Sequence, residues 1–376
     1  YRSRYNVWRR VIVRGDGCGL AACAGGGNPN VGITVYDSAD VTLENVMVLD
    51  RVLAPTDSPY SDFAVAQHTP GVPYGNNRWL GTVSLGAPDT AYYFEPDETS
   101  ASPAHQLIDC IAWNAADGGI NLARTGTSIV DRCTIGTLNG DGIRVAPELG
   151  GTGTIVRNVI VTGSGRYGLN SSTAPSYADV FGTWTSAYNQ TACTVGCLTS
   201  NPRADGTPAS LTYLPRIEAG SALSGAGLNG SDIGANVVFR YGVDGTRHGD
   251  VGYDTLTGVP LWPWPHEARI RAEMCTATPR GFCGAPSITE YIWGLLGGQP
   301  PILPDAAPAA DASTADAATI MPDAGAGPDA GVMPPRGPGC ACSVGGRRGA
   351  STGLLFLAVC LVTGSWLRRR SARSPA

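Results

Sequence analysis

Residues 111–161 read IAWNAADGGI NLARTGTSIV DRCTIGTLNG DGIRVAPELG GTGTIVRNVI V. Three apolar triplets recur in this stretch, at Ile111-Ala112-Trp113, Cys133-Thr134-Ile135 and Val159-Ile160-Val161, and they begin 22 and 26 residues apart. Between them, Gly119-Ile120-Asn121-Leu122 and Gly142-Ile143-Arg144-Val145 share a second pattern, a glycine followed by alternating apolar and polar residues. A repeat of this length predicts one coil of a parallel β-helix, in which each strand pairs with its equivalents in the neighbouring coils.

The same patterns extend outward to about residues 8–245. Further examples are Val11-Ile12-Val13, Val46-Met47-Val48, Val237-Val238-Phe239, Gly32-Ile33, Gly168-Leu169 and Gly242-Val243. We therefore predict an all-β fold, a right-handed parallel β-helix over residues 1–259, with the handedness that parallel crossovers generally prefer. One inward column should hold Ile33, Ile120, Ile143 and Leu169. Asn45, Asn158 and Asn236 each precede a triplet, which predicts a stacked asparagine column.

Two stretches interrupt the repeat, near residues 53–106 and 171–233. We predict loop insertions there, bordering one face of the solenoid. Residues 260–298, with Leu261-Trp262-Pro263-Trp264-Pro265 and a short helix over His266–Met274, should form a small cap on the last open coil.

The repeat resembles the pectate-lyase-like superfamily of right-handed parallel β-helices over roughly residues 8–245. Asn139-Gly140-Asp141-Gly142 resembles the Asn-x-Asp-Gly segment of polygalacturonase-type hydrolases, which implies that Asp141 belongs to a catalytic carboxylate set. The paired Asp-Asp, Gly-His-Gly and Arg-x-Lys segments of those hydrolases are absent from the coils that follow, and the chain contains no lysine. The resemblance therefore supports the fold more strongly than the activity.

Asp117 and Asp141 precede glycines at corresponding turns of adjacent coils, where stacking would bring the two carboxylates together. Crowded carboxylates raise each other's pKa, as a general acid requires. Alternatively, Asp-Gly simply makes a tight turn. The candidate residues are Asp117, Asp141 and Arg144 for catalysis, and Asn121, Arg166 and Asn170 for substrate binding.

Arg144 suits a uronate carboxylate, and the asparagines suit sugar hydroxyls. A lyase alternative uses Arg144 as the base and a bound Ca²⁺ to acidify the substrate. The hydrolase interpretation needs no cofactor and no metal. His105 and His68, in or beside the first interruption, are further candidates.

The net charge of −5 is opposite to that of proteins that bind nucleic acid, so we expect no nucleic-acid partner. The absence of lysine excludes Schiff-base chemistry. Eight cysteines of the predicted globular part form pairs that indicate disulfides in an oxidising compartment. These pairs are Cys18 with Cys23, Cys110 with Cys133, Cys193 with Cys197, and Cys275 with Cys283.

The composition changes near Pro300. Residues 299–338 are rich in Pro, Ala and Asp and predict a disordered linker. Residues 350–367 are apolar and uncharged, long enough as a helix to cross a bilayer, and the following arginines place the C-terminus in the cytoplasm. Residues 339–376, with Cys340 and Cys342, resemble the myxobacterial C-terminal sorting signal.

That tail implies a membrane-anchored, extracellular protein that is handled by a sorting machinery. We expect a monomer that binds, and as a hydrolase or lyase processes, a polysaccharide or cell-surface glycan. The alternative is a non-catalytic adhesin or structural protein of the cell surface.

Overall fold

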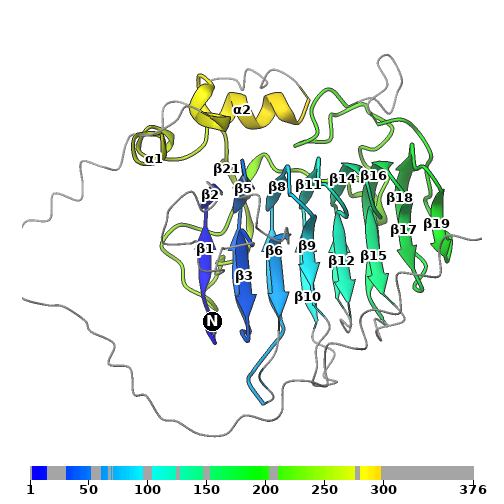
Figure 1. The fold of residues 1–376 in the computed structure, drawn as a ribbon, viewed down its shortest axis with the longest axis horizontal. Coiled ribbons are helices and arrows are strands. Elements are labelled where there is room, and N and C mark those ends of the chain that lie inside the picture. The colour runs from blue at the N-terminus through cyan, green and yellow to red at the C-terminus, as the bar shows by residue number, and fades with distance from the viewer. Residues whose placement is uncertain are drawn as a thin grey trace, which may run out of the picture. The chain divides into compact units, whose positions relative to one another are not determined.

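The computed structural model describes residues 2–14, 31–51, 61–66, 69, 71–95, 104–123, 128–146, 153–202, 211–275 and 280–297. They belong to a compact unit that spans Tyr1–Ala310. Within this unit, parallel strands form two curled sheets, an arrangement consistent with a parallel β-helix-like solenoid (Figure 1). The predicted β class and the parallel pairing of the repeats are therefore confirmed.

The solenoid strands fall into three rows. The first row contains β1 (Val7–Arg9), β4 (Thr42–Glu44), β7 (Asn77–Leu80), β10 (His105–Ile108), β13 (Ile129–Asp131) and the start of β16 (Ile155–Ser164). The second contains β2 (Ile12–Arg14), β5 (Met47–Leu49), β8 (Val83–Leu85), β11 (Ile111–Trp113), β14 (Thr134–Leu138), the end of β16 and β18 (Ser176–Phe181). The third contains β3 (Ile33–Tyr36), β6 (Ser61–Ala66), β9 (Thr90–Phe94), β12 (Ile120–Ala123), β15 (Ile143–Ala146), β17 (Tyr167–Ser171) and β19 (Ser186–Gln190). Because β16 belongs to both, the first two rows form one 12-stranded sheet.

The predicted inward column is confirmed by the register of the third row. Ile120 pairs with Ile143, and Ile143 pairs with Leu169. Phe63 and Tyr92 occupy the two positions between Ile33 and Ile120. All six side chains are buried in one core cluster, because alternate residues of each strand point into the coil.

Residues in left-handed backbone conformation form the corners between the first and second rows. Asn45, Asp109 and Asn158 have φ angles of 49°, 54° and 53° there, a region that Asn and Asp tolerate better than most residues. Gly81 and Arg132 fill the corners of intervening coils, so the predicted asparagine column is not continuous. Asn236 lies outside the coils, where its backbone N–H donates to Asp109 at 3.2 Å.

The solenoid differs from the predicted boundaries. Residues 53–106, predicted as an insertion, contain β6 to β9 and the start of β10, and residues 171–233 contain β18 and β19. Val237-Val238-Phe239 and Gly242-Val243 do not form a coil. Instead, β20 (Phe239–Tyr241) pairs antiparallel with β21 (Leu256–Pro260) in a separate two-stranded sheet.

The aromatic segment after β21 covers the side of the solenoid rather than its last coil. It contains α1 (Glu267–Met274) and α2 (Ile288–Leu295), which lie beside the N-terminal strands of the second row (Figure 1). Trp262, Trp264 and Trp293 pack with Met47 and Val83 of that row in one buried cluster. The outward side chains of β5, β8 and β11 are apolar, so they need this cover.

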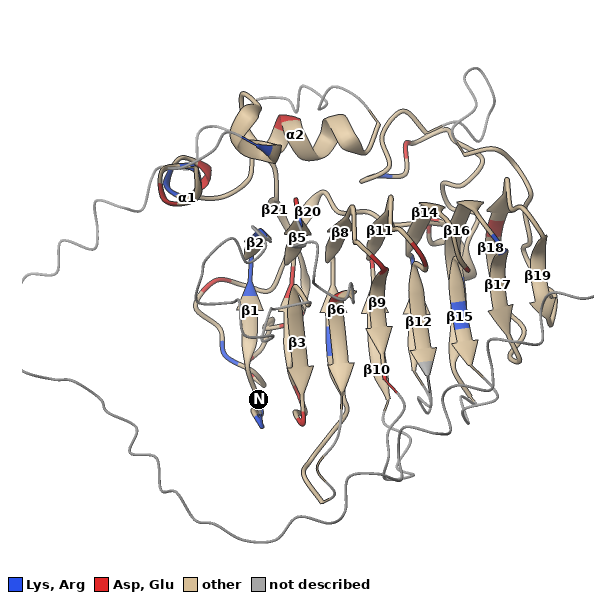
Figure 2. Ribbon diagram, viewed as in Figure 1, with Lys and Arg blue, Asp and Glu red and all other residues tan. Residues whose placement is uncertain are grey.

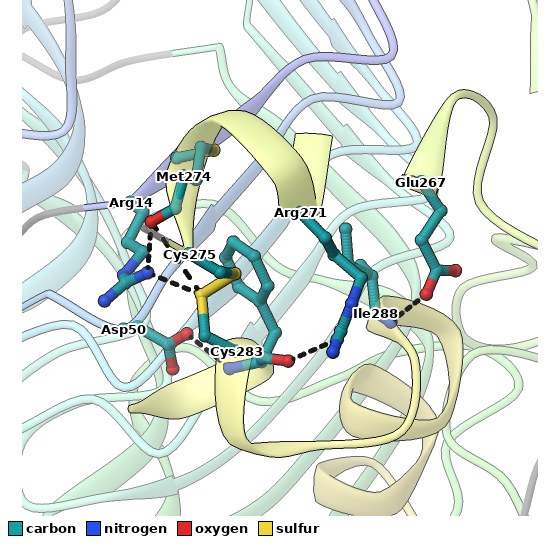
Figure 3. Close-up of a disulfide and its surroundings, with 9 residues drawn as sticks. Arg14, Asp50, Glu267, Arg271, Met274, Cys275, Cys283 and Ile288 are labelled. Carbon is teal, nitrogen blue, oxygen red and sulfur yellow. Dashed lines mark hydrogen bonds between the residues drawn. A yellow bond between two sulfur atoms is a disulfide. The ribbon is translucent and has the colours of Figure 1, made fainter. Parts of the chain in front are cut away.

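The Cys275–Cys283 disulfide lies where this segment meets the first coils (Figure 3). Arg14 of β2 donates to the carbonyl of Met274 at 3.0 Å, and Asp50 accepts from the backbone N–H of Phe282 at 3.0 Å. The segment is therefore tied to the solenoid by polar contacts as well as by apolar packing.

Two of the predicted disulfides are present, Cys193–Cys197 and Cys275–Cys283. Cys110 and Cys133 are instead free, buried thiols, so the bond predicted between them is not formed. Both side chains belong to the solenoid core, where each thiol contacts backbone carbonyls. Cys18 and Cys23 lie outside the described residues.

Residues 299–338, the span 350–367 and the motif cysteines Cys340 and Cys342 also lie outside the described residues. Within the part of the chain that the structure describes, no helix has the length and apolar character needed to cross a bilayer.

Candidate functional site

The turns that lead into β12, β15 and β17 stack on one another. The backbone N–H of Gly140 donates to the carbonyl of Asp117 at 2.8 Å, and that of Gly119 donates to the carbonyl of Asp141 at 3.1 Å. Glycine is required here, because a Cβ at Gly119 would lie 2.4 Å from the carbonyl oxygen of Gly142. The turn residues Asp117 and Asp141 thus come from adjacent coils, as predicted.

The carboxylate of Asp141 is buried and already has several partners. Its Oδ2 accepts from Asn170 Nδ2 at 2.9 Å, and its Oδ1 accepts from the Tyr167 backbone N–H at 3.4 Å. Arg166 Nε lies 3.5 Å from Oδ1, with most of the arginine side chain exposed. Asp141 therefore orders Asn170 and Arg166, whereas Asp117 is exposed to solvent.

A polar row runs across the outer face of the third row of strands. Asn121 pairs with Arg144, and Arg144 pairs with Asn170, as predicted. The row continues to Tyr93 on one side and Asn189 on the other. Asn189 donates to Asn170 at 3.0 Å. Figure 2 shows the basic band on β15, with acidic segments above β9 and β12.

These residues enclose a small pocket of about 70 Å³, here named the Asp pocket. It is lined by Thr90, Asp117, Gly118, Ile120, Asn121, Asp141, Arg144 and Arg166. All three predicted catalytic residues and two of the three predicted binding residues meet in it. Asn170 is connected to it through Asp141.

One atom of the Asp pocket has an unused hydrogen-bonding capacity. Asn121 Oδ1 is buried and accepts no hydrogen bond from the described residues. Buried acceptors without a donor are rare in folded proteins, so this oxygen suits a donor on a bound molecule.

A third carboxylate, Asp89, adjoins the pocket on the preceding coil and was not among the predicted residues. The backbone N–H of Asp117 donates to the carbonyl of Asp89 at 3.0 Å. Burial, and then the charge of Asp117, raise the pKa of Asp89. Its position in Pro88-Asp89-Thr90 matches that of Asp117 in the next coil, but the coil was hidden inside the predicted insertion.

His105 does not contribute to any surface site. It is fully buried among Tyr74, Trp79 and Phe94, and burial lowers the pKa of its imidazole to about 3. His68 lies outside the described residues. Among the described residues, no three His, Cys, Asp or Glu side chains are grouped so that they could hold a metal ion.

The sequence also missed a larger hollow on the other side of these turns. Two adjoining pockets of about 250 and 510 Å³ share Arg51, Gly86, Asn114 and Thr137. We name them together the turn groove. It shares no lining residue with the Asp pocket.

No protein-family model, curated protein or solved structure matches this chain.

Proposed function

We propose that this protein binds a polysaccharide or cell-surface glycan through the Asp pocket and the polar row beside it. The observation that carries the proposal is the meeting of Asp117, Asp141, Arg144 and Arg166 with Asn121 in one pocket. Carboxylates, guanidinium groups and amides together offer both donors and acceptors, which sugar hydroxyls need. The partly exposed residues of the polar row from Tyr93 to Asn189 then provide contacts for further sugar units.

Individual roles follow from the geometry. Asp117 is exposed and accepts hydrogen bonds from hydroxyl groups of the ligand. Arg166 and Arg144 donate to ring or hydroxyl oxygens, or to a uronate carboxylate. Asn121 Oδ1 accepts from a ligand hydroxyl and so gains the donor that it lacks. The hydrogen bond from Asn170 to the carboxylate of Asp141 orients both side chains.

Turnover is the second part of the proposal, and two versions are open. In a hydrolase, Asp117 and Asp141 form the carboxylate pair, and neighbouring Asp89 is a third carboxyl group whose pKa is raised by burial and by the charge of Asp117. In a lyase, Arg144 would act as the base, and Asp117 and Asp141 would hold a divalent cation such as Ca²⁺, whose charge would acidify the sugar acid. A non-catalytic adhesin or structural protein is favoured by the partners that already occupy the carboxylate of Asp141.

The proposed setting of this site is the cell surface. We propose that the chain is related to the right-handed, pectate-lyase-like β-helices. The length of the coil repeat and the parallel register of its strands support this proposal. The tail, residues 339–376, would anchor a monomeric solenoid to the membrane, and the linker, residues 299–338, would separate the two. A sorting machinery that recognises Cys340 and Cys342 would deliver the protein to the cell surface. The apolar span and its basic end support this location.

A glycan array with the full chain tests the binding proposal. Asp117→Asn and Arg144→Ala should each weaken binding by ten-fold or more, since each removes a charged hydrogen-bonding group. Asp250→Asn, at an exposed turn far along the chain, is the matched control and should bind as the parent does. Retention of parent affinity in both pocket variants would show that the glycan binds elsewhere.

Product analysis on any bound glycan separates the versions. Hydrolysis that is abolished by Asp141→Asn supports the carboxylate pair. An unsaturated product seen by ultraviolet absorbance, dependent on a divalent cation and lost in Arg144→Ala, supports the lyase. Binding without any product supports the adhesin.

A further inference from the structure

The turn groove follows the turns between the second and third rows, across several coils. Its larger part is lined by Gly86, Ala87, Pro88, Asn114, Ala115, Ala116, Thr137, Leu138, Asn139 and Gly163, with Arg51 at one side. Its smaller part adds Asp50, Leu85 and Trp113 from the solenoid and Tyr291 and Leu295 from α2. The groove is therefore elongated along the stack, with an apolar and aromatic end beneath α2.

Arg51 provides the groove with a hydrogen-bond donor that lacks an acceptor among the described residues. Its side chain is only 3% exposed, and Nη1 donates to the carbonyl of Ser61 at 2.7 Å and to Asp62 at 3.1 Å. Nη2 is buried and has no acceptor among the described residues. A buried donor on a charged group is energetically unfavourable without an acceptor, so an acceptor brought by a ligand would be favoured.

Asp62 cannot supply that acceptor as it stands. Its Oδ1 faces Arg51 Nη1, and its Oδ2 accepts from Ser84 Oγ at 2.7 Å. The ion pair with Asp62 holds the guanidinium group of Arg51 in the wall of the groove. Its Nη2 remains without an acceptor among the described residues. Arg51 is thus an oriented donor rather than a mobile surface arginine.

One tryptophan lines the groove, and a second, on a later coil, lies near its other end in the backbone. Trp113 is half-buried in its smaller part. On a later coil, Trp184 is 87% exposed, and its backbone N–H donates at 2.9 Å to Ser164, the neighbour of the lining residue Gly163. Trp113 ends β11, and Trp184 follows β18, which lies three coils further along the stack, about 14 Å at ~4.8 Å per coil. An exposed tryptophan whose backbone lies close to a groove suits stacking against the apolar face of a sugar ring.

We propose that the turn groove is a second saccharide-binding site, separate from the Asp pocket, for an extended chain that runs along the stack. One sugar unit packs against Trp113 and places an oxygen acceptor on Arg51 Nη2. The chain crosses Asn114 and Thr137, whose polar groups contact its hydroxyls, and ends against Trp184. The inference rests on the proposed saccharide class but not on the Asp pocket, so the two sites can fail independently.

Two hexasaccharides serve as probes, chitohexaose as the neutral one and hexamannuronate as the acidic one. Calorimetric titration of the full chain should show binding of at least one. Preference for the acidic probe assigns a carboxylate to Arg51, and equal or better binding of the neutral probe assigns a hydroxyl or amide oxygen. Absence of binding to both would overturn the inference.

Variants then locate the binding. Trp184→Ala should weaken it about three- to ten-fold without affecting the fold, because the side chain is almost fully exposed. Arg51→Lys keeps the charge beside Asp62 but loses Nη2, and should weaken binding ten-fold or more. Trp8→Ala, at a tryptophan that is 45% exposed on β1, is the matched control and should bind as the parent does.

The pattern of losses distinguishes this inference from the proposed function. Parent affinity in both Trp184→Ala and Arg51→Lys would overturn the second site. If Asp117→Asn and Arg144→Ala then abolish binding of the same probe, the proposed function stands while this inference fails. Binding that is lost in the groove variants but retained in Asp117→Asn and Arg144→Ala would support the turn groove and count against the Asp pocket. A thermal melt of Arg51→Lys close to that of the parent shows that its loss of affinity is not a loss of fold.

Discussion

Acidification should destabilise the solenoid through His105. Burial lowers the pKa of His105 from 6.5 to about 3 in the folded protein. The unfolded chain therefore binds a proton below pH 6.5 that the folded chain does not bind. Stability from this residue is complete above pH 6.5 and is lost as the pH falls toward 3. Each pH unit in that window removes about 1.4 kcal/mol, so the loss at pH 4 is about 3 kcal/mol.

The substitution His105→Leu isolates this effect. Both imidazole nitrogens are buried without hydrogen-bond partners among the described residues. Replacing the imidazole by an apolar side chain therefore breaks no hydrogen bond to these residues. The difference in unfolding free energy between His105→Leu and the parent should increase by about 3 kcal/mol in favour of the variant between pH 7 and pH 4.

Urea unfolding of the full chain at several pH values measures that difference. Burial also raises the pKa of Asp62 to about 6, but this carboxyl group is present in both proteins and cancels. Leu107→Val, on the same strand and equally buried, is the control and should differ from the parent by the same amount at every pH. A difference between His105→Leu and the parent that stays constant from pH 7 to pH 4 would refute a buried, uncharged His105.

Three further predictions address the core, the thiols and the tail. Ile143→Asp should cost more than about 3 kcal/mol in urea unfolding, because it places an unpaired charge at a fully buried position. Ile143→Val should cost only about 1 kcal/mol, and similar losses for both variants would contradict the inward column. Alkylation of the unfolded, unreduced chain should label Cys110 and Cys133 but leave Cys193, Cys197, Cys275 and Cys283 unlabelled, as mass spectrometry of peptides would show. Removing residues 339–376 should release the protein from cells into the medium, and retention of the truncated chain on cells would count against the tail as the anchor.

The repeat around residues 111–161 predicted the inward column and the polar row because a strand's side chains alternate strictly between its two faces. Once Ile120 and Ile143 occupy equivalent positions, Asn121 and Arg144 must point outward together. The same stacking brings the turns of Asp117 and Asp141 together. The Asp pocket was therefore largely predictable from local sequence.

The coils within residues 53–106 were missed because they lack the two patterns used to recognise the repeat. In the second row, β8 reads Val83-Ser84-Leu85 rather than an apolar triplet, and in the third row no glycine precedes Phe63 or Tyr92. In β6, Phe63 and Val65 belong to the core, and Asp62 at the start of the strand is buried through its contacts with Arg51 and Ser84. Sequence patterns assign a charged residue to the surface, because the partner that allows it to be buried lies elsewhere in the chain. The missed coil also concealed Asp89.

The parallel repeat, the inward and outward faces of β12, β15 and β17, and most residues of the Asp pocket could be derived from the amino-acid sequence alone. These features follow from periods within one coil, which neighbouring coils simply copy. Three other features emerged from the three-dimensional structure: the segment with Trp262, Trp264 and Trp293 covers the second row, Cys110 and Cys133 remain free, and Arg51 lines a groove with Trp113 and α2. These features depend on contacts between residues far apart in the chain, and the sequence period carries no information about which distant surface a nonrepeating segment will bury.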